Sequence, residues 1–266
     1  MNIHPKRFKL ILEFDGSRYS GWQKQDDAVT IQGALLDAAA KIFSAPADVQ
    51  GSGRTDAGVH GLHYGAHLEV QTDLSPLEIA KRLNAALPHD IAVLECKRAG
   101  ARFHARLHCI GRSYCYQIAR RKCALARNHV WQVTEPLDVE LMGEAASMLV
   151  GMHDFTSFTD RQVIKKKSPL VMVHQCRVAA AGDLLLIRIV GSHFLWKMVR
   201  RIAGVLVAVG KGELTETELR RFLQEPVTLK QYTAPAQGLF FERAFYDQDE
   251  LDAFLAADEL KPVFCR

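Results

Sequence analysis

The sequence predicts an α+β fold of two similar subdomains, each built on a mixed, mostly antiparallel sheet flanked by helices. Three observations favour this class. Apolar or alternating runs typical of strands are separated by segments with helical spacing, and turn residues lie between them. The order strand, helix, strand, helix, strand in the first part is followed by a second, similar mixture. We therefore expect subdomains 1–105 and 106–266.

The first subdomain begins with an apolar strand at 8–14, which ends at the turn residues 15–17. Thr30 is the expected N-cap of a helix whose apolar residues recur at helical spacing. Ser75 opens a second helix, because Pro occupies the first helical position and Glu78 completes a capping box. The remaining strands are expected at 48–53, 62–70 and 91–98.

In the second subdomain, the turn residues 181–183 separate two strand-like runs and predict a β-hairpin. Thr215 is the expected N-cap of a helix, and apolar periodicity predicts a long helix before it. The expected strands are 107–120, 130–133, 173–179, 184–190 and 239–246. The expected helices are 138–150, 194–208, 215–224 and 248–257.

The composition is that of an ordinary globular protein, with 266 residues of which 48% are apolar and 24% charged. No apolar stretch reaches the roughly 18–20 residues of a membrane span. The N-terminal apolar run is interrupted too early, by Glu13 and Asp15, for a signal peptide. Six cysteines occur without a C-x-x-C pair, so we expect free thiols. These features favour a cytoplasmic protein without a membrane partner.

Positive charge is concentrated in residues 97–127, although the net charge of the chain is only +4. The segment has no Asp or Glu, and three aromatic residues are interleaved with its basic ones. Such a segment suggests a polyanionic partner, because each basic contact to phosphate releases counterions. A solvated basic face is the alternative, but the length of the segment favours nucleic-acid contact. Its basic residues are Lys97, Arg98, Arg102, Arg106, Arg112, Arg120, Arg121, Lys122 and Arg127.

A glycine-rich run, GSGRTDAGVHG at 51–61, brings Arg54 and Asp56 together on a tight loop after a strand. A dinucleotide-binding G-x-G-x-x-G does not fit, since no Gly lies three residues after Gly53, and the Gly-Lys-Ser/Thr of a P-loop is missing. Asp56 is therefore a candidate nucleophile, and Arg54 a candidate for contact with phosphate. A glycine-rich turn in which Asp56 caps a helix is an equally good interpretation of the run alone.

Histidines at three nearby positions raise the question of a metal site. No Cys or paired carboxylate near His60, His63 and His67 completes a zinc site in the sequence, so no metal is expected. Neither the nucleophile elbow of a serine hydrolase nor a phosphate-binding lysine motif is present in the sequence.

The run GRTDAGVH resembles the signature of the TruA family of tRNA pseudouridine synthases. Further segments resemble other blocks of that family in the right order, so the resemblance covers essentially the whole chain. It implies the pseudouridine synthase fold, with an active-site cleft between the two subdomains, and isomerisation of uridine to pseudouridine in tRNA. The segments are FDGSRYSGWQKQ (14–25), FHARLHCIGRSYCYQI (103–118), HDFTSF (153–158), FLWKMVRRIAGVLVAVGKG (194–212) and APAQGLFFERAFY (234–246).

The resemblance also implies the residues of the active site. The family's nucleophilic aspartate corresponds to Asp56, its active-site tyrosine to Tyr114 and its active-site arginine to Arg200. The arginine that is linked with extruding the target base corresponds to Arg54. An arginine partner favours the ionised form of Asp56, which a nucleophile requires.

The predicted helix at 194–206 supports the assignment of Arg200 independently. At 100° per residue its apolar side chains form one stripe, and Lys197, Arg200 and Gly204 lie on the opposite side. We expect an ion pair between Arg200 and Asp56; a solvent-facing arginine is the alternative without the family context. Candidates for substrate binding are Arg54, Arg106, Arg112, Tyr114 and Lys197.

Pseudouridine formation breaks the N1–C1′ bond of uridine and rejoins the uracil through C5 without redox change or net hydrolysis, so no cofactor is expected. The family's aspartate either attacks the uridine covalently or assists glycal formation, and both routes stay open. The resemblance implies tRNA as substrate, at uridines 38, 39 and 40 of the anticodon stem-loop, and a homodimer. The alternatives are a non-catalytic RNA-binding protein of the same fold and a synthase that acts on another RNA.

Overall fold

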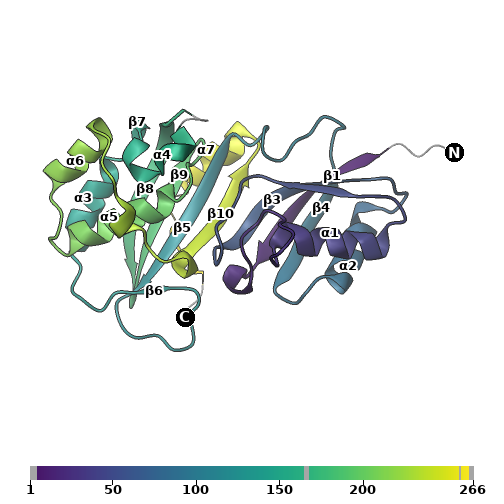
Figure 1. Ribbon diagram of the computed structural model, residues 1–266, viewed down its shortest axis with the longest axis horizontal. Helices are drawn as coiled ribbons and strands as arrows, with labels where there is room; N and C mark the ends of the chain where they lie inside the picture. Colours follow the sequence, from purple (N-terminus) through teal and green to yellow (C-terminus); the bar gives the residue numbers. More distant parts are fainter. Residues whose placement is uncertain (1–4, 165–167, 258, 264–266) are drawn as a thin grey trace. The chain divides into compact units, whose positions relative to one another are not determined.

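The computed structural model describes residues 5–164, 168–257 and 259–263 (Figure 1). Contacts within the chain divide it into two compact units. Unit 1 is formed by residues up to 110 together with 240–246, and unit 2 by 111–239 together with the residues from 247 on. The α+β class with a mixed, mostly antiparallel sheet is confirmed. The two similar subdomains divided at residue 105 stay a proposal.

Unit 1 combines the strands of a twisted sheet with two α-helices (Figure 1). Its elements are β1 (Lys6–Phe14), the 3₁₀ helix η1 (Gly16–Arg18), α1 (Ile31–Ile42), β2 (Asp48–Gly51), β3 (His60–Val70), α2 (Pro76–Ala86), β4 (Ile91–Arg98) and β10 (Leu239–Phe245). The strand order is β4-β1-β3-β10, with β2 paired to β3. All these pairs are antiparallel except β10 with β3. Alternate residues of β1, Phe8, Leu10 and Leu12, are fully buried, because one face of the sheet forms the core.

Unit 2 is built around two strands that are buried along their whole length, β5 and β9. Its strands are β5 (Gly111–Ala119), β6 (Trp131–Gln132), β7 (Gly151–Asp154), β8 (Leu170–Ala181) and β9 (Leu184–Gly191). Their order is β5-β9-β8-β7, all antiparallel, with β6 parallel to β5. The helices are α3 (Val139–Ser147), η2 (Thr156–Phe158), α4 (Arg161–Ile164), α5 (Met198–Gly210), α6 (Glu216–Gln224), η3 (Lys230–Tyr232), η4 (Ala236–Gly238) and α7 (Gln248–Ala256).

The helix starts that the sequence predicts from capping residues are confirmed. The Thr30 hydroxyl accepts the backbone N–H of Gly33 at 3.2 Å. Ser75 and Glu78 form the expected capping box: the Glu78 carboxylate accepts the Ser75 N–H at 3.0 Å, and the Ser75 hydroxyl accepts the Glu78 N–H at 3.3 Å. Thr215 caps α6 in the same way. These groups satisfy backbone donors that the first turn of a helix leaves unpaired.

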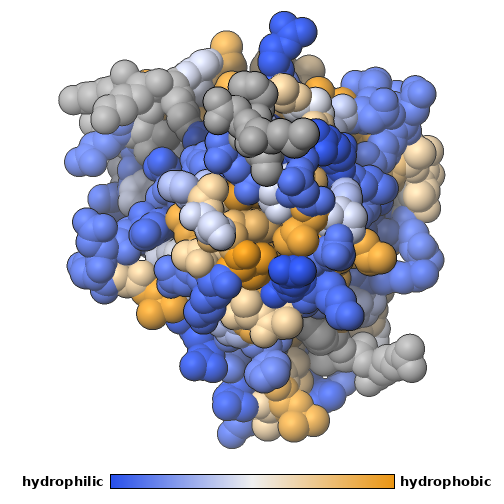
Figure 2. Space-filling model, turned by 90° about the vertical axis from the view of Figure 1, so that its right-hand side faces the viewer, coloured by the Kyte–Doolittle hydropathy of each residue, from blue (hydrophilic) through white to orange (hydrophobic). Residues whose placement is uncertain are grey.

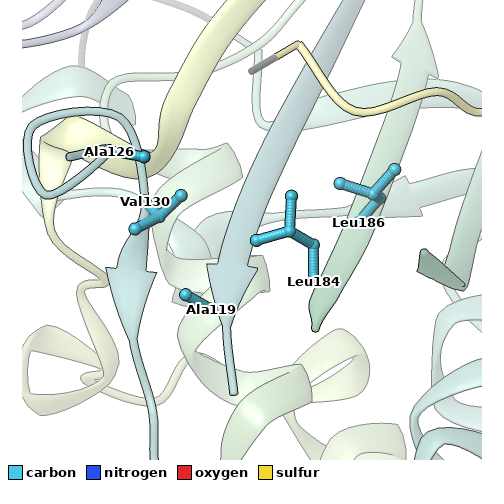
Figure 3. Packing of buried hydrophobic residues seen from close by; sticks show 5 residues of the cluster. All are labelled: Ala119, Ala126, Val130, Leu184 and Leu186. Atoms are coloured by element: carbon cyan, nitrogen blue, oxygen red, sulfur yellow. The ribbon is translucent and has the colours of Figure 1, made fainter. Parts of the chain in front are cut away.

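A small buried cluster anchors the loop after β5 to the β8–β9 hairpin (Figure 3). Ala126 and Val130 of the loop pack with Leu184 and Leu186 of β9, beside Ala119 at the end of β5. The loop carries the last basic residues of the 97–127 segment. This apolar anchor therefore fixes the loop onto the hairpin, in addition to the ion pair of Arg121 with Asp183 in the hairpin turn.

Two elements begin four residues later than predicted. The helix predicted at 194–208 begins only at Met198, because Lys197 has the left-handed backbone angle φ 61° and cannot continue a helix backwards. The strand predicted at 107–120 begins at Gly111, since the residues before it form turns. The sequence pattern also fails to predict β7 and α4, which are each four residues long and too short for periodicity to register.

Charged and polar side chains cover most of the face in Figure 2, and apolar groups gather near its centre. None of the helices in the described ranges combines the length and the apolar character that crossing a bilayer requires. Free thiols are found at five of the cysteines, Cys96, Cys109, Cys115, Cys123 and Cys176. Cys265 lies outside the described residues.

Candidate active site

The glycine-rich run forms a turn between β2 and β3 in unit 1. The turn closes where the N–H of Val59 donates to the carbonyl of Asp56 at 3.2 Å, and Gly58 takes a positive φ of 79°. Strand β3 begins at the next residue, His60. The interpretation of Asp56 as a helix cap is wrong, because the chain continues from this turn into a strand.

A cluster of aromatic rings supports the turn from the core of unit 1. The Trp22 and Tyr64 ring centroids lie 4.4 Å apart, and those of Tyr64 and Phe241 lie 4.8 Å apart. The Tyr64 hydroxyl donates a hydrogen bond to the carbonyl of Gly53. A side chain at Gly51 would put its Cβ 2.0 Å from the Tyr64 hydroxyl oxygen. Glycine at this position is therefore what lets the turn lie directly on the rings.

The loop after β1 holds the same turn from a second side. The N–H of Trp22 donates to the carbonyl of Thr55 at 3.2 Å, and the N–H of Gly58 donates to the carbonyl of Tyr19 at 3.3 Å. Gly21 has a φ of 89°, and a Cβ there would lie 2.4 Å from the Thr55 carbonyl oxygen. The backbone on both sides of Asp56 is thus bonded to one preceding loop.

That loop is itself fixed by a partly buried hydrogen bond. The Tyr19 hydroxyl donates to the Asp90 carboxylate at 2.5 Å, and burial together with this bond raises the pKa of Tyr19 well above its usual value. Sequence reasoning treats FDGSRYSGWQKQ only as a block of family resemblance. Its glycines and aromatic residues follow an Asp-Gly turn, and this pattern could have indicated a loop that supports the candidate nucleophile.

The three central residues of the turn differ in exposure. The Arg54 side chain is exposed and makes no hydrogen bond or ion pair with any described residue. Thr55 is buried, and its hydroxyl has no hydrogen-bond partner within the described ranges. The Asp56 side chain is half-buried. The turn therefore offers a partly desolvated carboxylate beside a guanidinium that faces solvent.

In unit 2, Tyr114 lies in the middle of β5, opposite Ile189 of β9. Its ring meets that of Phe194 edge to face, with centroids 5.2 Å apart at an interplanar angle of 85°. An edge-to-face pair of this kind holds a ring in one orientation. Phe194 is a contact that sequence reasoning missed, since it placed Phe194 in the apolar stripe of a helix that starts four residues later.

Arg200 lies in the first turn of α5, and both its side chain and its backbone carbonyl form hydrogen bonds with Ala234. Its side-chain Nε donates to the carbonyl of Ala234 at 2.8 Å, and its own carbonyl accepts the N–H of Ala234 at 3.1 Å. The neighbouring carbonyl, that of Pro235, accepts the hydroxyl of Tyr116 at 2.7 Å. Burial raises the pKa of Tyr116 far above its usual value, so this hydroxyl stays a donor.

The predicted apolar stripe covers only part of the buried surface of this helix. Every residue of α5 except Arg200 is buried. The segment around η3 covers the face of Gly204, where a Cβ would lie 1.7 Å from the carbonyl oxygen of Tyr232. Gly204 thus allows a close approach of this chain's own backbone.

Two comparisons identify the family. The family model described as tRNA pseudouridine synthase matches residues 10–107 and 145–247. The chain belongs to this family. Curated relatives named tRNA pseudouridine synthase A are 40% identical over 244 residues in Zymomonas mobilis subsp. mobilis (90% of this chain, 99% of the relative) and 38% identical over 245 residues in Rhodospirillum centenum (91% and 100%). A third, from Rhodopseudomonas palustris, is 40% identical over 251 residues (91% and 99%).

As a member of the tRNA pseudouridine synthase family, the chain is an isomerase of tRNA uridine. The structure places Arg54, Asp56 and Arg106 in unit 1, and Arg112, Tyr114, Lys197 and Arg200 in unit 2. The ion pair between Asp56 and Arg200 and the active-site cleft stay predictions, because each joins residues of the two units.

The candidate substrate-binding residues of unit 2, Arg112 and Lys197, are held by contacts with neighbouring residues. Arg112 is 8% exposed, and its Nη1 donates to the Ser192 carbonyl at 2.8 Å. Lys197 has its ammonium 4.2 Å from the centroid of the Trp196 ring, a cation–π contact. Its backbone is left-handed just before α5, and its carbonyl accepts the N–H of Arg201 at 3.0 Å. These residues are fixed in place rather than spread over a mobile charged face.

The basic segment also meets acidic groups from elsewhere in the chain. Arg121 pairs with Asp183 of the β8–β9 turn at 2.5 Å. Lys97 pairs with Glu95, two residues before the segment begins. The segment contains no acidic residue, but folding brings carboxylates from other parts of the chain beside it. The folded surface around it therefore carries both charges.

Proposed function

We propose that this protein converts the uridines at positions 38, 39 and 40 of the tRNA anticodon stem-loop to pseudouridine, with Asp56 as the nucleophile. The observation that carries the proposal is the turn that presents Asp56. Its backbone is bonded to the preceding loop and rests on buried aromatic rings, while Arg54 beside it faces solvent. A rigid turn of this kind presents a carboxylate with little reorganisation, as a nucleophile requires.

The chemistry assigns a role to each candidate. Asp56 attacks the uridine covalently or assists formation of a glycal, the N1–C1′ bond breaks, and uracil rejoins C1′ through C5. Arg200 is the ion-pair partner of Asp56, which must carry its negative charge to attack. Tyr114 stacks on the uracil and moves a proton. The reaction needs no cofactor or metal, because it has no redox change and no net hydrolysis.

The target base must leave its stack before it can react, which costs a few kcal/mol. Arg54 takes the place of the extruded base, supported by its exposed position on the turn. Phosphates of the stem-loop are bound by Arg106, Arg112 and Lys197, together with the exposed basic residues of 97–127. Tight enclosure of the uridine also keeps water from capturing the severed sugar, which would leave an abasic site.

The proposed function also includes where the enzyme works and how it assembles. We assign it to the cytoplasm as a homodimer in which one tRNA touches both subunits. The subdomains 1–105 and 106–266 each contribute part of the active site. Gel filtration with light scattering, with and without tRNA, measures the state of assembly, and a monomer in both conditions contradicts the dimer.

The test of the nucleophile is Asp56→Asn, assayed by tritium release from C5-labelled uridine in unmodified tRNA. The amide keeps the shape of the side chain but cannot attack, so we expect turnover to fall by about 10⁴-fold or more. Measurable turnover within tenfold of wild type contradicts the assignment. Arg54→Gln is the control on the same turn. It should lower the turnover less than Asp56→Asn does, because Arg54 assists base extrusion without reacting.

The same assay separates the alternatives. If neither wild type nor variant turns over but both bind tRNA, the protein is a non-catalytic RNA-binding protein. If wild type releases tritium from another RNA and not from tRNA, it is a synthase with a different substrate. Sequencing the modified positions in tRNA distinguishes uridines 38, 39 and 40 from other sites.

A further inference from the structure

A turn at 103–108 in unit 1 is tied by three imidazole rings that act as hydrogen-bond acceptors. The N–H of Ala105 donates to Nδ1 of His67 at 3.1 Å, and the N–H of His104 donates to Nδ1 of His108 at 3.1 Å. The N–H of Arg106 donates to Nδ1 of His104 at 3.1 Å. An imidazole nitrogen accepts such a bond only while it carries no proton.

The turn is also bonded to residues of β1 and β3 and to Tyr246. His67 of β3 is 1% exposed, and its ring centroid lies 4.9 Å from that of His104. The Tyr246 hydroxyl donates to the carbonyl of Ala105 at 3.0 Å. Arg7 of β1 donates from Nη1 to the carbonyl of Phe103 at 2.7 Å. The turn is thus bonded through its backbone, and the side chain of Arg106 projects from it at an exposed position.

We propose that His67 is a positioning residue that holds the 103–108 turn through a neutral imidazole nitrogen, and that acidification favours an open turn in which Arg106 leaves its tRNA-binding position. The tRNA part rests on the proposed function of Arg106. The hydrogen-bonding part depends only on unit 1, to which all these residues belong.

The charges around His67 support the neutral form. Burial lowers the pKa of His67 most, followed by Arg7 and His104, while Asp48 on β2 and Glu69 on β3 raise it; the result is about 4. Lys9, its register neighbour on β1, adds another positive group on this face. An open turn exposes His67, whose pKa then returns to about 6.5.

The sign of the pH effect follows from these two pKa values. The open turn binds more protons than the closed one, so the opening constant rises as the pH falls from about 6.5 towards 4. For a shift from about 6.5 to about 4, the opening constant is about tenfold higher at pH 5.5 than at pH 8. Charge alone would make tRNA binding tighter at low pH, because protonated histidines add positive charge. Opening of the turn is expected to weaken tRNA binding at low pH.

Amide hydrogen exchange on the full-length protein measures this opening at Ala105. We expect the protection of the Ala105 amide, corrected for intrinsic exchange, to fall about tenfold between pH 8 and pH 5.5. In His67→Asn the side-chain carbonyl accepts the same N–H without titrating, so protection should be independent of pH. His63→Asn, at an exposed position of the same strand, should behave as wild type. Equal protection of wild type at both pH values overturns the proposal.

Nitrogen-15 spectra of the wild-type protein give a readout that needs no variant. We expect Nδ1 of His67 to be unprotonated at pH 7 and to titrate near pH 4. A protonated Nδ1, or titration near 6.5, overturns the proposal even if His67→Asn fails to fold.

The tRNA part has its own measurement. With unmodified tRNA transcript at pH 7.5, Arg106→Ala and His67→Ala should both raise KM about tenfold with little change in kcat, and His67→Asn should restore KM. If Ala105 protection behaves as expected but Arg106→Ala leaves KM unchanged, the tRNA role of Arg106 fails while the histidine-held turn stands. If Arg106→Ala raises KM and His67→Ala does not, the positioning role of His67 is overturned.

Discussion

Asp56 in unit 1 and Arg200 in unit 2 are held in opposite ways. Asp56 lies on a turn whose backbone is bonded to a neighbouring loop and rests on aromatic rings. Arg200 lies in a helix that is buried around it, and its own side chain is bonded to a backbone carbonyl. The position of Asp56 therefore requires glycines that leave room for the turn. The position of Arg200 requires Gly204, which lets another backbone segment come close to α5. Replacing these glycines with alanine tests both requirements.

The largest effect is expected for Gly204→Ala in unit 2. The new Cβ would lie 1.7 Å from the Tyr232 carbonyl oxygen, so either α5 or the segment that bonds Arg200 must shift. Overpacking of this kind costs about 3 kcal/mol of unfolding free energy. A displacement of about 1 Å at Arg200 lowers kcat by about 100-fold. Denaturant unfolding and steady-state kinetics measure the two effects.

Gly143→Ala is the matched control for this helix substitution. Gly143 lies inside α3, and a Cβ there meets no described atom within 4 Å. Alanine should stabilise the helix by about 1 kcal/mol and leave kcat unchanged. If Gly204→Ala behaves like Gly143→Ala, the close approach does not position Arg200.

A smaller effect is expected for Gly21→Ala in unit 1. Gly21 has a φ of 89°, and its Cβ would lie 2.4 Å from the Thr55 carbonyl oxygen, next to Asp56. The left-handed backbone costs about 1–2 kcal/mol for alanine, and displacement of the turn should lower kcat by about tenfold. Gly212→Ala shares the positive φ, 74°, but has no described atom within 4 Å, so it should lose stability alone. Equal kcat in both variants would contradict positioning of Asp56 by this loop.

The smallest effects are expected when single hydroxyls are removed on the two sides. Tyr64→Phe removes the hydrogen bond to the Gly53 carbonyl, and Tyr116→Phe removes the bond to the Pro235 carbonyl. Each should cost about 1 kcal/mol of unfolding free energy, because both rings stay packed while one acceptor loses its partner. Thermal unfolding compares the pair directly. A loss in only one variant would show that the two regions differ in how much they rely on side-chain hydrogen bonds.

Much of the local structure is predictable from particular residues. Thr30, Ser75 and Thr215 mark helix starts, because an N-cap needs only a side-chain oxygen and a backbone N–H two or three residues on. The start of α5 is not predictable, since the apolar period continues back to Phe194. The left-handed backbone of Lys197 interrupts the helix, and lysine has no local preference for that conformation.

The sequence by itself determined the fold class, most of the longer elements, the glycine-rich turn and the candidate side chains, because spacing and capping act over a few residues. Tertiary structure alone decided what surrounds those side chains. It placed Trp22 and Tyr64 beneath the turn of Asp56, Ala234 against Arg200, and three histidines around the turn of Arg106. Such contacts join residues far apart in the chain, and their partners follow from packing rather than from any local pattern.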